Sequence, residues 1–117
     1  MKQQYKAGIS GENLAEQYLC KLGMQLLTRR YRGGDGEIDL IMQDGSTIVF
    51  VEVKSRPASQ PGTGLMAITP GKQRRMTHAA MTFLYERQLT EHQVRFDAVE
   101  ISRDGMIHIP NAFMAAE

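Results

Sequence analysis

The stretch TIVFVEVKSR, residues 47–56, constrains the fold most, because it predicts a buried strand that carries two charges. Residues 47–53 are mostly β-branched or aromatic, as in strands that are covered on both faces. Glu52 and Lys54 interrupt this run without ending it. Since alternate side chains of a strand share a face, both charges are expected on the face that carries Phe50. The chain therefore places a carboxylate and an amine where a core strand would otherwise bury apolar side chains.

Helical and strand-like periodicities alternate along the rest of the chain. The sequence predicts helices over 11–23 and 70–87, strands over 24–32, 37–42, 46–55 and 94–102, and a short, weak strand over 106–109. Ser10 and Thr69 are the predicted N-caps of the two helices. The strand–helix–strand step through the second helix predicts a right-handed parallel crossover. The predicted fold class is α/β, with the order α-β-β-β-α-β and a mixed central sheet flanked by helices.

The first helix carries two adjacent apolar rows. Leu14, Tyr18 and Leu22 recur every four residues, with Ala15 and Leu19 beside them, and all five are expected to face the core. Between the third strand and the second helix lies a long loop, 56–70, which is rich in proline and glycine. Loops of this length in small domains are typical of functional segments.

Length and composition point to a single soluble domain over residues 1–117. Cys20 is the one cysteine, which excludes an internal disulfide and a cysteine-based zinc site and is typical of the cytoplasm. The first residues lack the apolar core of a signal peptide, and no run is long enough to cross a bilayer. A membrane is therefore not expected as a partner. The glycines near 62 do not lead from a strand into a helix, as those of a phosphate-binding loop do, so no nucleotide cofactor is expected.

Positive charge is clustered although the net charge is only +1. No acid occurs from Tyr18 to Gly34 or from Val53 to Tyr85, and both segments are basic. Clustered cations can hold a phosphate backbone. The candidates for contacts with nucleic acid are Arg29, Arg30, Arg32, Arg56, Lys72, Arg74 and Arg75. The alternative is that these residues form ordinary solvated faces.

The predicted hairpin brings acidic side chains together. Asp44-Gly45 is typical of a two-residue turn. With that turn, the predicted cross-strand pairs are Gln43 with Ser46, Ile41 with Ile48, Asp39 with Phe50 and Glu37 with Glu52. Asp39 and Glu52 then become diagonal neighbours on a face that also carries Lys54.

Carboxylates that share a face repel one another unless a positive charge lies among them. A hard divalent cation, Mg²⁺ or Mn²⁺, suits Asp39 and Glu52, because such ions take oxygen ligands, waters and substrate phosphate oxygens. The ammonium group of Lys54 would orient a water or stabilise charge on a phosphate. The alternative is a salt bridge in which Lys54 simply neutralises one of the acids.

Each predicted helix also directs one charge inward at its N-terminal end. Glu12 aligns with Ala15 and Leu19, and Lys72 aligns with the apolar residues of the second helix. For Glu12 the alternative is a carboxylate that benefits from the helix dipole. For Lys72 the alternative is an amine that extends from the rim of the sheet into water.

Several of these strings resemble a known group of proteins. Asp39, followed after twelve residues by Glu52-Val53-Lys54, resembles the PD-(D/E)XK nuclease signature, with Ile38 in place of its proline. The helix that carries Glu12 resembles the archaeal Holliday-junction resolvase branch. The ordered strings GENLAEQYL, GEIDLI, FVEVKSR, RFDAVEI and HIPNAF resemble the YraN family of small bacterial proteins.

This resemblance implies a restriction-endonuclease-like fold and metal-dependent hydrolysis of DNA phosphodiesters. Glu12, Asp39 and Glu52 would be acidic catalytic residues, and Lys54 the catalytic lysine. Asp39, Glu52 and the Val53 carbonyl would bind the metal. Arg95 and Asp97, on one strand face, are expected to form a salt bridge that flanks the site, and a ligand role for Asp97 is a weaker alternative.

The resulting hypothesis is a cytoplasmic, Mg²⁺- or Mn²⁺-dependent DNA endonuclease, with branched or structured DNA as the preferred substrate. Because a single copy presents a small footprint, either a homodimer or a partner protein is expected to complete it. The loop over 56–70 would close over the strand that is cut. Two alternatives stay open. One is a protein of the same fold that binds nucleic acid or a partner without cutting it, and the other is a structural subunit of a larger complex.

Overall fold

The computed structural model describes residues 7–56, 58–62, 64 and 67–116, and only the backbone of residues 7–10. These residues form two helices and five strands. Their bounds are α1 Ala7–Lys21, β1 Gln25–Gly33, β2 Gly36–Asp44, β3 Thr47–Ser55, α2 Pro70–Glu86, β4 Gln93–Ser102 and β5 Gly105–Phe113. The predicted α/β class and element order are confirmed, although the last strand is longer than predicted.

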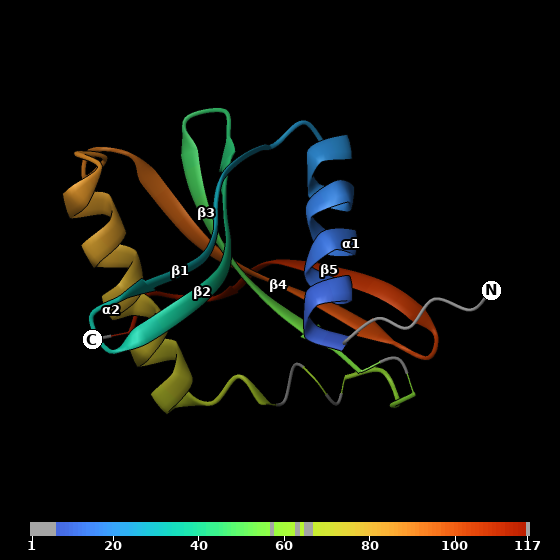
Figure 1. Ribbon diagram of the computed structural model, residues 1–117. Coiled ribbons are helices and arrows are strands. Elements are labelled where there is room, and N and C mark those ends of the chain that lie inside the picture. The colour runs from blue at the N-terminus through green and yellow to red at the C-terminus, as the bar shows by residue number, and fades with distance from the viewer. Residues whose placement is uncertain (1–6, 57, 63, 65–66, 117) are drawn as a thin grey trace.

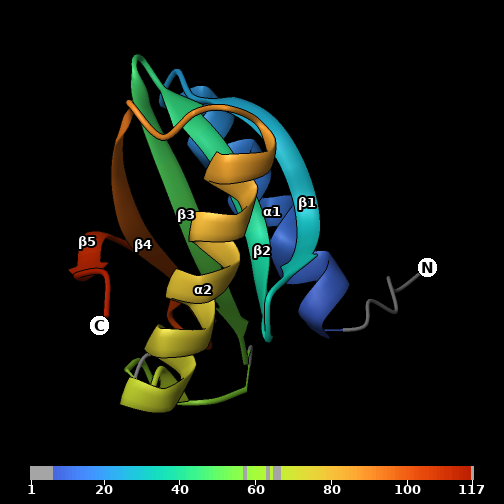
Figure 2. The same cartoon turned by 90° about the vertical axis from the view of Figure 1, so that its left-hand side faces the viewer.

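The strands form one mixed sheet in the order β1-β2-β3-β4-β5. β3 and β4 are parallel and are connected through α2, whereas all other neighbours are antiparallel. Helix α1 covers one face of the sheet and α2 the other (Figures 1 and 2). Neither helix in the described part of the chain has the length and hydropathy of a membrane span.

Each helix packs on its face of the sheet through a separate apolar cluster. On the α1 face, Ala15 and Leu19 pack with Val51 and its neighbours. On the α2 face, the ring of Phe83 meets the ring of Phe50 edge to face at 6.1 Å and the ring of Tyr31 edge to face at 5.2 Å. Burial of both clusters supplies the main driving force for folding, because apolar area is removed from water on both sides of the central strands.

Helix α1 differs from the prediction at its start and on its surface. It begins at Ala7, so Ser10 lies inside the helix and is not its N-cap. Leu14, Tyr18 and Leu22 are 45%, 37% and 53% exposed. Adjacent rows on a helix point in directions about 100° apart. The sheet therefore buries only the row beside these three residues.

The β2–β3 hairpin is paired differently from the prediction. Asp44 pairs with Thr47, so the loop consists of Gly45 and Ser46. Gly45 has a φ of 62°, which glycine adopts without steric cost. The turn is thus shifted by one residue along the chain, because glycine takes the first loop position and leaves Asp44 in the strand.

This shift changes the pairs but not the faces. Ile41 lies opposite Phe50, two positions beyond the predicted Ile48. Since side chains alternate with a period of two, a displacement by two residues returns each side chain to its predicted face. Asp39 and Glu52 therefore still share a face, and they lie closer in register than the predicted diagonal arrangement.

Candidate active site

β2 and β3 separate near the middle of the sheet. Their pairing ends at Leu40 and Val51, after which β2 continues beside β1 and β3 continues beside β4. Figure 1 shows the two ribbons diverging below this point. The gap is called the fork here and comprises residues 37–39 of β2 and 52–54 of β3. The predicted acids occupy the first position on each side of the fork.

The Asp39 carboxyl group reaches across the fork. Its Oδ2 accepts a 2.7 Å hydrogen bond from the backbone N–H of Val53. Burial raises the pKa of Asp39 to about 7, and the negative charge of Glu52 adds to the increase, against the lowering effect of the Val53 N–H. The two carboxyl groups therefore lie close enough for the charge of Glu52 to raise the pKa of Asp39.

Glu52 is almost completely buried and receives two ammonium groups. Its Oε2 lies 3.0 Å from Lys54 Nζ and 2.9 Å from Lys72 Nζ. Burial lowers the pKa of Lys72, but the hydrogen bond and attraction from Glu52 outweigh burial and raise that pKa overall. Thr69 helps to place Lys72, because its Oγ1 caps α2 by accepting from the Lys72 backbone N–H at 3.2 Å, as predicted.

Glu12 approaches the fork from the α1 side of the sheet. Its Oε1 accepts a 3.0 Å hydrogen bond from Nε of Arg30. Arg30 lies opposite Asp39 in the β1–β2 register and has a φ of 51°, which is uncommon outside glycine. The charge of Glu12 contributes to the raised pKa of Asp39, so its field reaches that carboxyl group. Glu12 itself is held by an arginine.

The two carboxyl groups of the fork suit a small, hard cation. Mg²⁺ is commonly held by one or two carboxylates together with waters and substrate phosphates. In the described part of the chain, no three His, Cys, Asp or Glu side chains gather to hold a metal. Asp39 and Glu52 are the predicted metal ligands that the fork brings together, and the Val53 carbonyl, the further predicted ligand, is adjacent to Glu52 in the chain. The negative charge that raises the pKa of Asp39 is charge that a cation would compensate.

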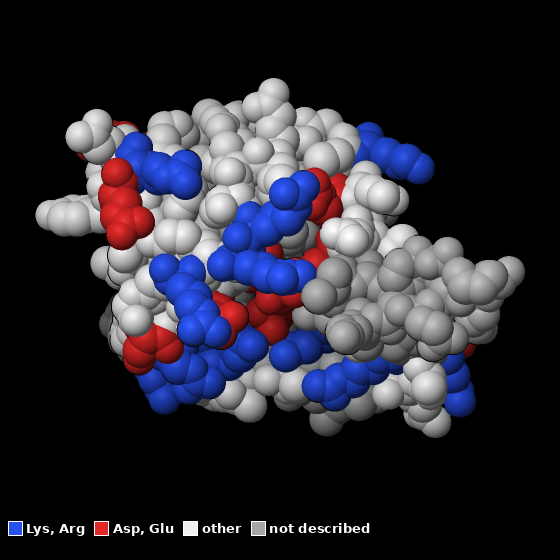
Figure 3. All heavy atoms as spheres, viewed as in Figure 1, with Lys and Arg blue, Asp and Glu red and all other residues white. Residues whose placement is uncertain are grey.

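A cavity of about 280 Å³ opens beside this pair. Asp39 and Glu52 form its inner wall, and Lys72, Arg75 and Met76 of α2 form part of its rim. Figure 3 shows acidic side chains at the centre of this face with Lys and Arg side chains gathered around them. Such an arrangement can attract an anion to the rim while the acids hold a cation at the base.

The predicted cationic residues fall into two groups. On β1, Arg29 pairs with Glu16 at 2.7 Å, Arg30 with Glu12 at 3.0 Å and Arg32 with Glu37 at 3.2 Å. These three arginines are neutralised by acids of the same chain. Arg56, Arg74 and Arg75 form no ion pair with any residue that the structure describes, and Arg75 lines the cavity. The α2 side of the fork is therefore the more electropositive side.

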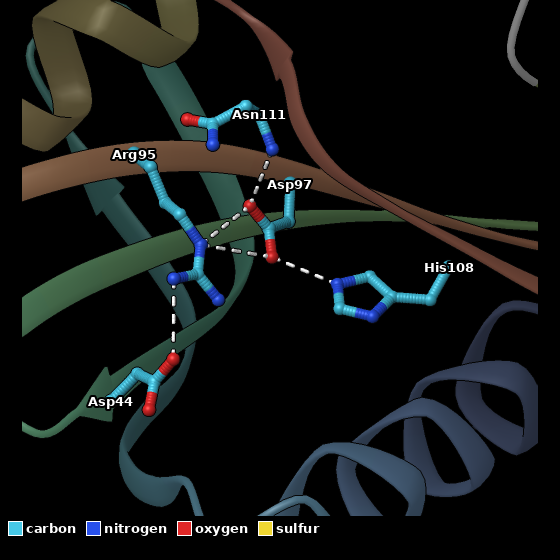
Figure 4. Close-up of polar contacts among 5 residues, drawn as sticks. All are labelled: Asp44, Arg95, Asp97, His108 and Asn111. Atoms are coloured by element: carbon cyan, nitrogen blue, oxygen red, sulfur yellow. Dashed lines mark hydrogen bonds and ion pairs between the residues drawn. The ribbon is translucent and has the colours of Figure 1, made fainter.

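The predicted Arg95–Asp97 salt bridge is present, at 3.0 Å, but it does not flank the fork. In the β3–β4 register Asp97 lies beside Val51, which belongs to the cluster on the α1 face, whereas Glu52 shares its face with Phe50. Asp97 also accepts from His108 at 2.8 Å and from the Asn111 backbone N–H at 3.0 Å (Figure 4). These bonds occupy both carboxylate oxygens, which leaves Asp97 poorly suited to bind a metal.

Glu100 is a buried acid that the sequence analysis missed. It is 1% exposed and shares a sheet face with Glu52, since Lys54 pairs with Glu100 across β3 and β4. The sequence does indicate this acid, because Glu100 interrupts a mainly apolar predicted strand in the same way that Glu52 interrupts the strand before the second helix.

Comparison with known proteins identifies relatives along almost the whole chain. The profile of a family described as "Uncharacterised protein family UPF0102" matches residues 11–101. A UPF0102 protein of Geobacter metallireducens is 42% identical over 113 residues, which cover 93% of each chain. A UPF0102 protein of Desulfosudis oleivorans is 41% identical over 116 residues, covering 97% of this chain and 93% of the relative. A third, of Herminiimonas arsenicoxydans, is 43% identical over 105 residues, covering 90% and 84%.

Proposed function

We propose that this chain, which belongs to the UPF0102 (YraN) family, is a metal-dependent endonuclease that hydrolyses phosphodiester bonds in DNA. The observation that carries the proposal is the convergence of Asp39, Glu52 and Lys54 in the fork. Two neighbouring carboxyl groups, with an ammonium group 3.0 Å from one of them, form an arrangement that hydrolysis of a phosphodiester can use.

Asp39 and Glu52 would hold Mg²⁺ or Mn²⁺, which supplies a Lewis acid that offsets phosphate charge and acidifies a bound water. Lys54 has a side chain that is only 18% exposed, so its charge acts in a poorly solvated place. From there Nζ can donate to the attacking water or to a phosphate oxygen and stabilise the charge that develops. Lys72 would help to hold the Glu52 side chain in place through its 2.9 Å ion pair.

The cations near the cavity rim would receive the DNA backbone. Arg75 lines the cavity, and Arg74 lies beside it on α2. Arginine suits this role because its planar guanidinium group bonds two phosphate oxygens at once. Branched DNA is the preferred substrate that the family resemblance implies, so four-way and flapped substrates belong in the test beside linear duplex.

The proposal is tested by cleavage of linear, flapped and four-way DNA with Mg²⁺ or Mn²⁺. Asp39→Asn, Glu52→Gln and Lys54→Gln preserve shape and remove one charge each. We expect each to lower the single-turnover rate by about a hundred- to a thousandfold, since one charged transition-state contact contributes on that scale. Glu91→Gln, at an exposed acid away from the fork, is the matched control and should cut like wild type.

A second candidate is a protein that binds DNA through this site without cutting it. The observation in its favour is that Glu52 already has two ammonium partners, so a metal ion is not needed to balance that carboxylate. In that case wild type and the three variants would all bind four-way DNA, and none would nick it in either metal. Cleavage that is equal in wild type and variants would point to a contaminant and would reject the proposed site.

A further inference from the structure

The buried acid Glu100 fastens a loop beside the fork. Its Oε1 accepts from the backbone N–H of Gly62 and its Oε2 from that of Gly64, each at 2.7 Å. Both distances are short for N–H donors, as expected when the acceptor is ionised. A carboxylate this deeply buried is costly unless its oxygens are bonded, and here each oxygen receives one backbone donor.

Two backbone hydrogen bonds hold the same segment against the end of β4. The Arg56 N–H donates to the Ile101 carbonyl at 2.7 Å, and the Arg103 N–H donates to the Ser59 carbonyl at 3.0 Å. The described part of the loop is therefore tied to β4 at several points. The Glu100 bonds differ from these two because they lie on the face of the sheet that carries the fork.

Gly64 lies directly against the side chain of Lys54. A Cβ atom at this position would lie 2.6 Å from Lys54 Cβ and 3.2 Å from Glu100 Oε2. Atoms do not approach this closely without displacement, so only glycine lets the loop backbone lie flat on the lysine stem. Lys54 and Glu100 are also register partners on neighbouring strands. The loop, the acid and the lysine are thus packed as one unit.

We propose that Glu100 is a positioning residue for Lys54. By holding Gly64 against the Lys54 stem, it restricts the rotamers of that side chain and keeps Nζ beside Glu52. The effect of Glu100 on catalysis rests on the proposed endonuclease function. The contact by which Glu100 holds Gly64 against the Lys54 stem, called the clamp below, does not depend on that function. Pre-organisation of this kind matters because a misplaced catalytic group loses much of its effect on the barrier.

The first measurement is hydrogen exchange of the Gly62 and Gly64 amides in Glu100→Gln. A glutamine can accept through one oxygen only, and its NH₂ group would face a backbone donor. We expect exchange at these amides to accelerate by about tenfold or more as the loop opens locally. Glu91→Gln should leave both amides unchanged. Unchanged protection in Glu100→Gln would overturn the clamp, whatever the protein is found to catalyse.

The second measurement separates positioning from general stability. On DNA, Glu100→Gln should lower kcat by about tenfold with KM unchanged, since the lysine acts on the chemical step. In a Lys54→Gln background, Glu100→Gln should cause no further loss, because its effect passes through the lysine. An equal loss in both backgrounds would show a merely structural role and overturn the proposal. Gly64→Ala, which keeps the acid but crowds Lys54, should reproduce the loss of kcat.

The Lys54 ammonium signal in ¹⁵N NMR decides the matter if wild type cuts no DNA. Glu100→Gln should then shift or broaden that signal, while Glu91→Gln leaves it in place. A Lys54 signal that does not change would reject the positioning role. Absence of cleavage together with a perturbed signal would reject only the proposed function.

Discussion

Two carboxyl groups on opposite faces of the same sheet, the buried Asp97 and the half-buried Asp39, have opposite surroundings. Asp97 has a fully buried side chain and receives donors from Arg95, His108 and the Asn111 backbone. Asp39 receives one backbone N–H and lies within reach of a second acid, and burial beside that acid raises its pKa to about 7. A cavity opens beside Asp39, whereas the bonds of Asp97 already occupy its oxygens.

The difference teaches how a site can be recognised on this fold. Both carboxyl groups are at least half-buried and both have cationic neighbours, so the presence of a nearby positive charge does not separate them. The two sites differ in their hydrogen bonding. Asp39 and Glu52 lie next to each other at a cavity in the fork, whereas both oxygens of Asp97 accept hydrogen bonds from nearby donors. Groups whose surroundings raise the cost of their charged form are more often functional than groups whose hydrogen bonds are complete.

The largest expected effect on the free energy of unfolding comes from substitution of Asp97, whose two carboxylate oxygens both accept hydrogen bonds. Asp97→Ala would remove the shared acceptor of Arg95 and His108, and Arg95 would keep only its ion pair with Asp44 at 3.2 Å. Removing one member of a buried charge network costs about 3 kcal/mol of unfolding free energy or more. We expect urea denaturation to show this loss while metal-dependent cleavage by the folded protein is unchanged. A loss below about 0.5 kcal/mol, the range of ordinary surface changes, would remove the contrast.

Substitution of Asp39, which lies beside a second acid, should raise the free energy of unfolding, whereas substitution of Asp97 should lower it. The folded pKa of Asp39 is about 7, above its ordinary value of 3.8, so the folded state binds more protons between those values. Stability of the metal-free protein therefore falls as pH rises through this window. Asp39→Asn cannot lose a proton and should be more stable than wild type at pH 8.

The expected gain for Asp39→Asn is about 1–3 kcal/mol at pH 8, because each pKa unit corresponds to about 1.4 kcal/mol. The difference should be smallest near pH 3, where Asp39 is mostly protonated in both the folded and the unfolded state. Denaturation in chelator at both pH values measures the gain. A gain of the same size at both pH values would show that repulsion among the acids is not its source.

The smallest expected effect is on DNA affinity, and it distinguishes the arginines of α2 from those of β1. Arg75→Ala should weaken binding of four-way DNA by several-fold and lower the salt dependence by about one phosphate contact. Arg29→Ala is the matched control, because Arg29 is already paired with Glu16 on the surface and such pairs contribute little. Fluorescence anisotropy at several salt concentrations measures both. Equal losses in the two variants would mean that the β1 arginines also contact DNA.

Much of this arrangement follows from local rules. The alternation along 47–55 correctly places Glu52 and Lys54 on one face of the sheet. The Thr69-Pro70 start of α2 correctly places Lys72 in the first turn of that helix. These features depend on the period of one element, which a sequence states directly. The register of the hairpin was wrong by two positions, because either residue of Asp44-Gly45 could have begun the loop.

The remaining features depend on parts of the chain that are far apart. Two partners of Asp97, His108 and Asn111, come from β5, and the place of Asp97 on the α1 face follows from the register between β3 and β4. Glu100 is satisfied by backbone groups of the long loop, which have no signature in side-chain patterns. The separation of β2 from β3, which creates the fork, is likewise a property of the sheet as a whole.

Titration of the purified protein with Mn²⁺ at pH 8, followed by calorimetry, tests the central claim most directly. Our account predicts one saturable site in wild type and in Arg29→Ala, and no binding by Asp39→Asn or Glu52→Gln. Retention of that site in both carboxyl variants would contradict the account, since the ion would then lie elsewhere on the molecule.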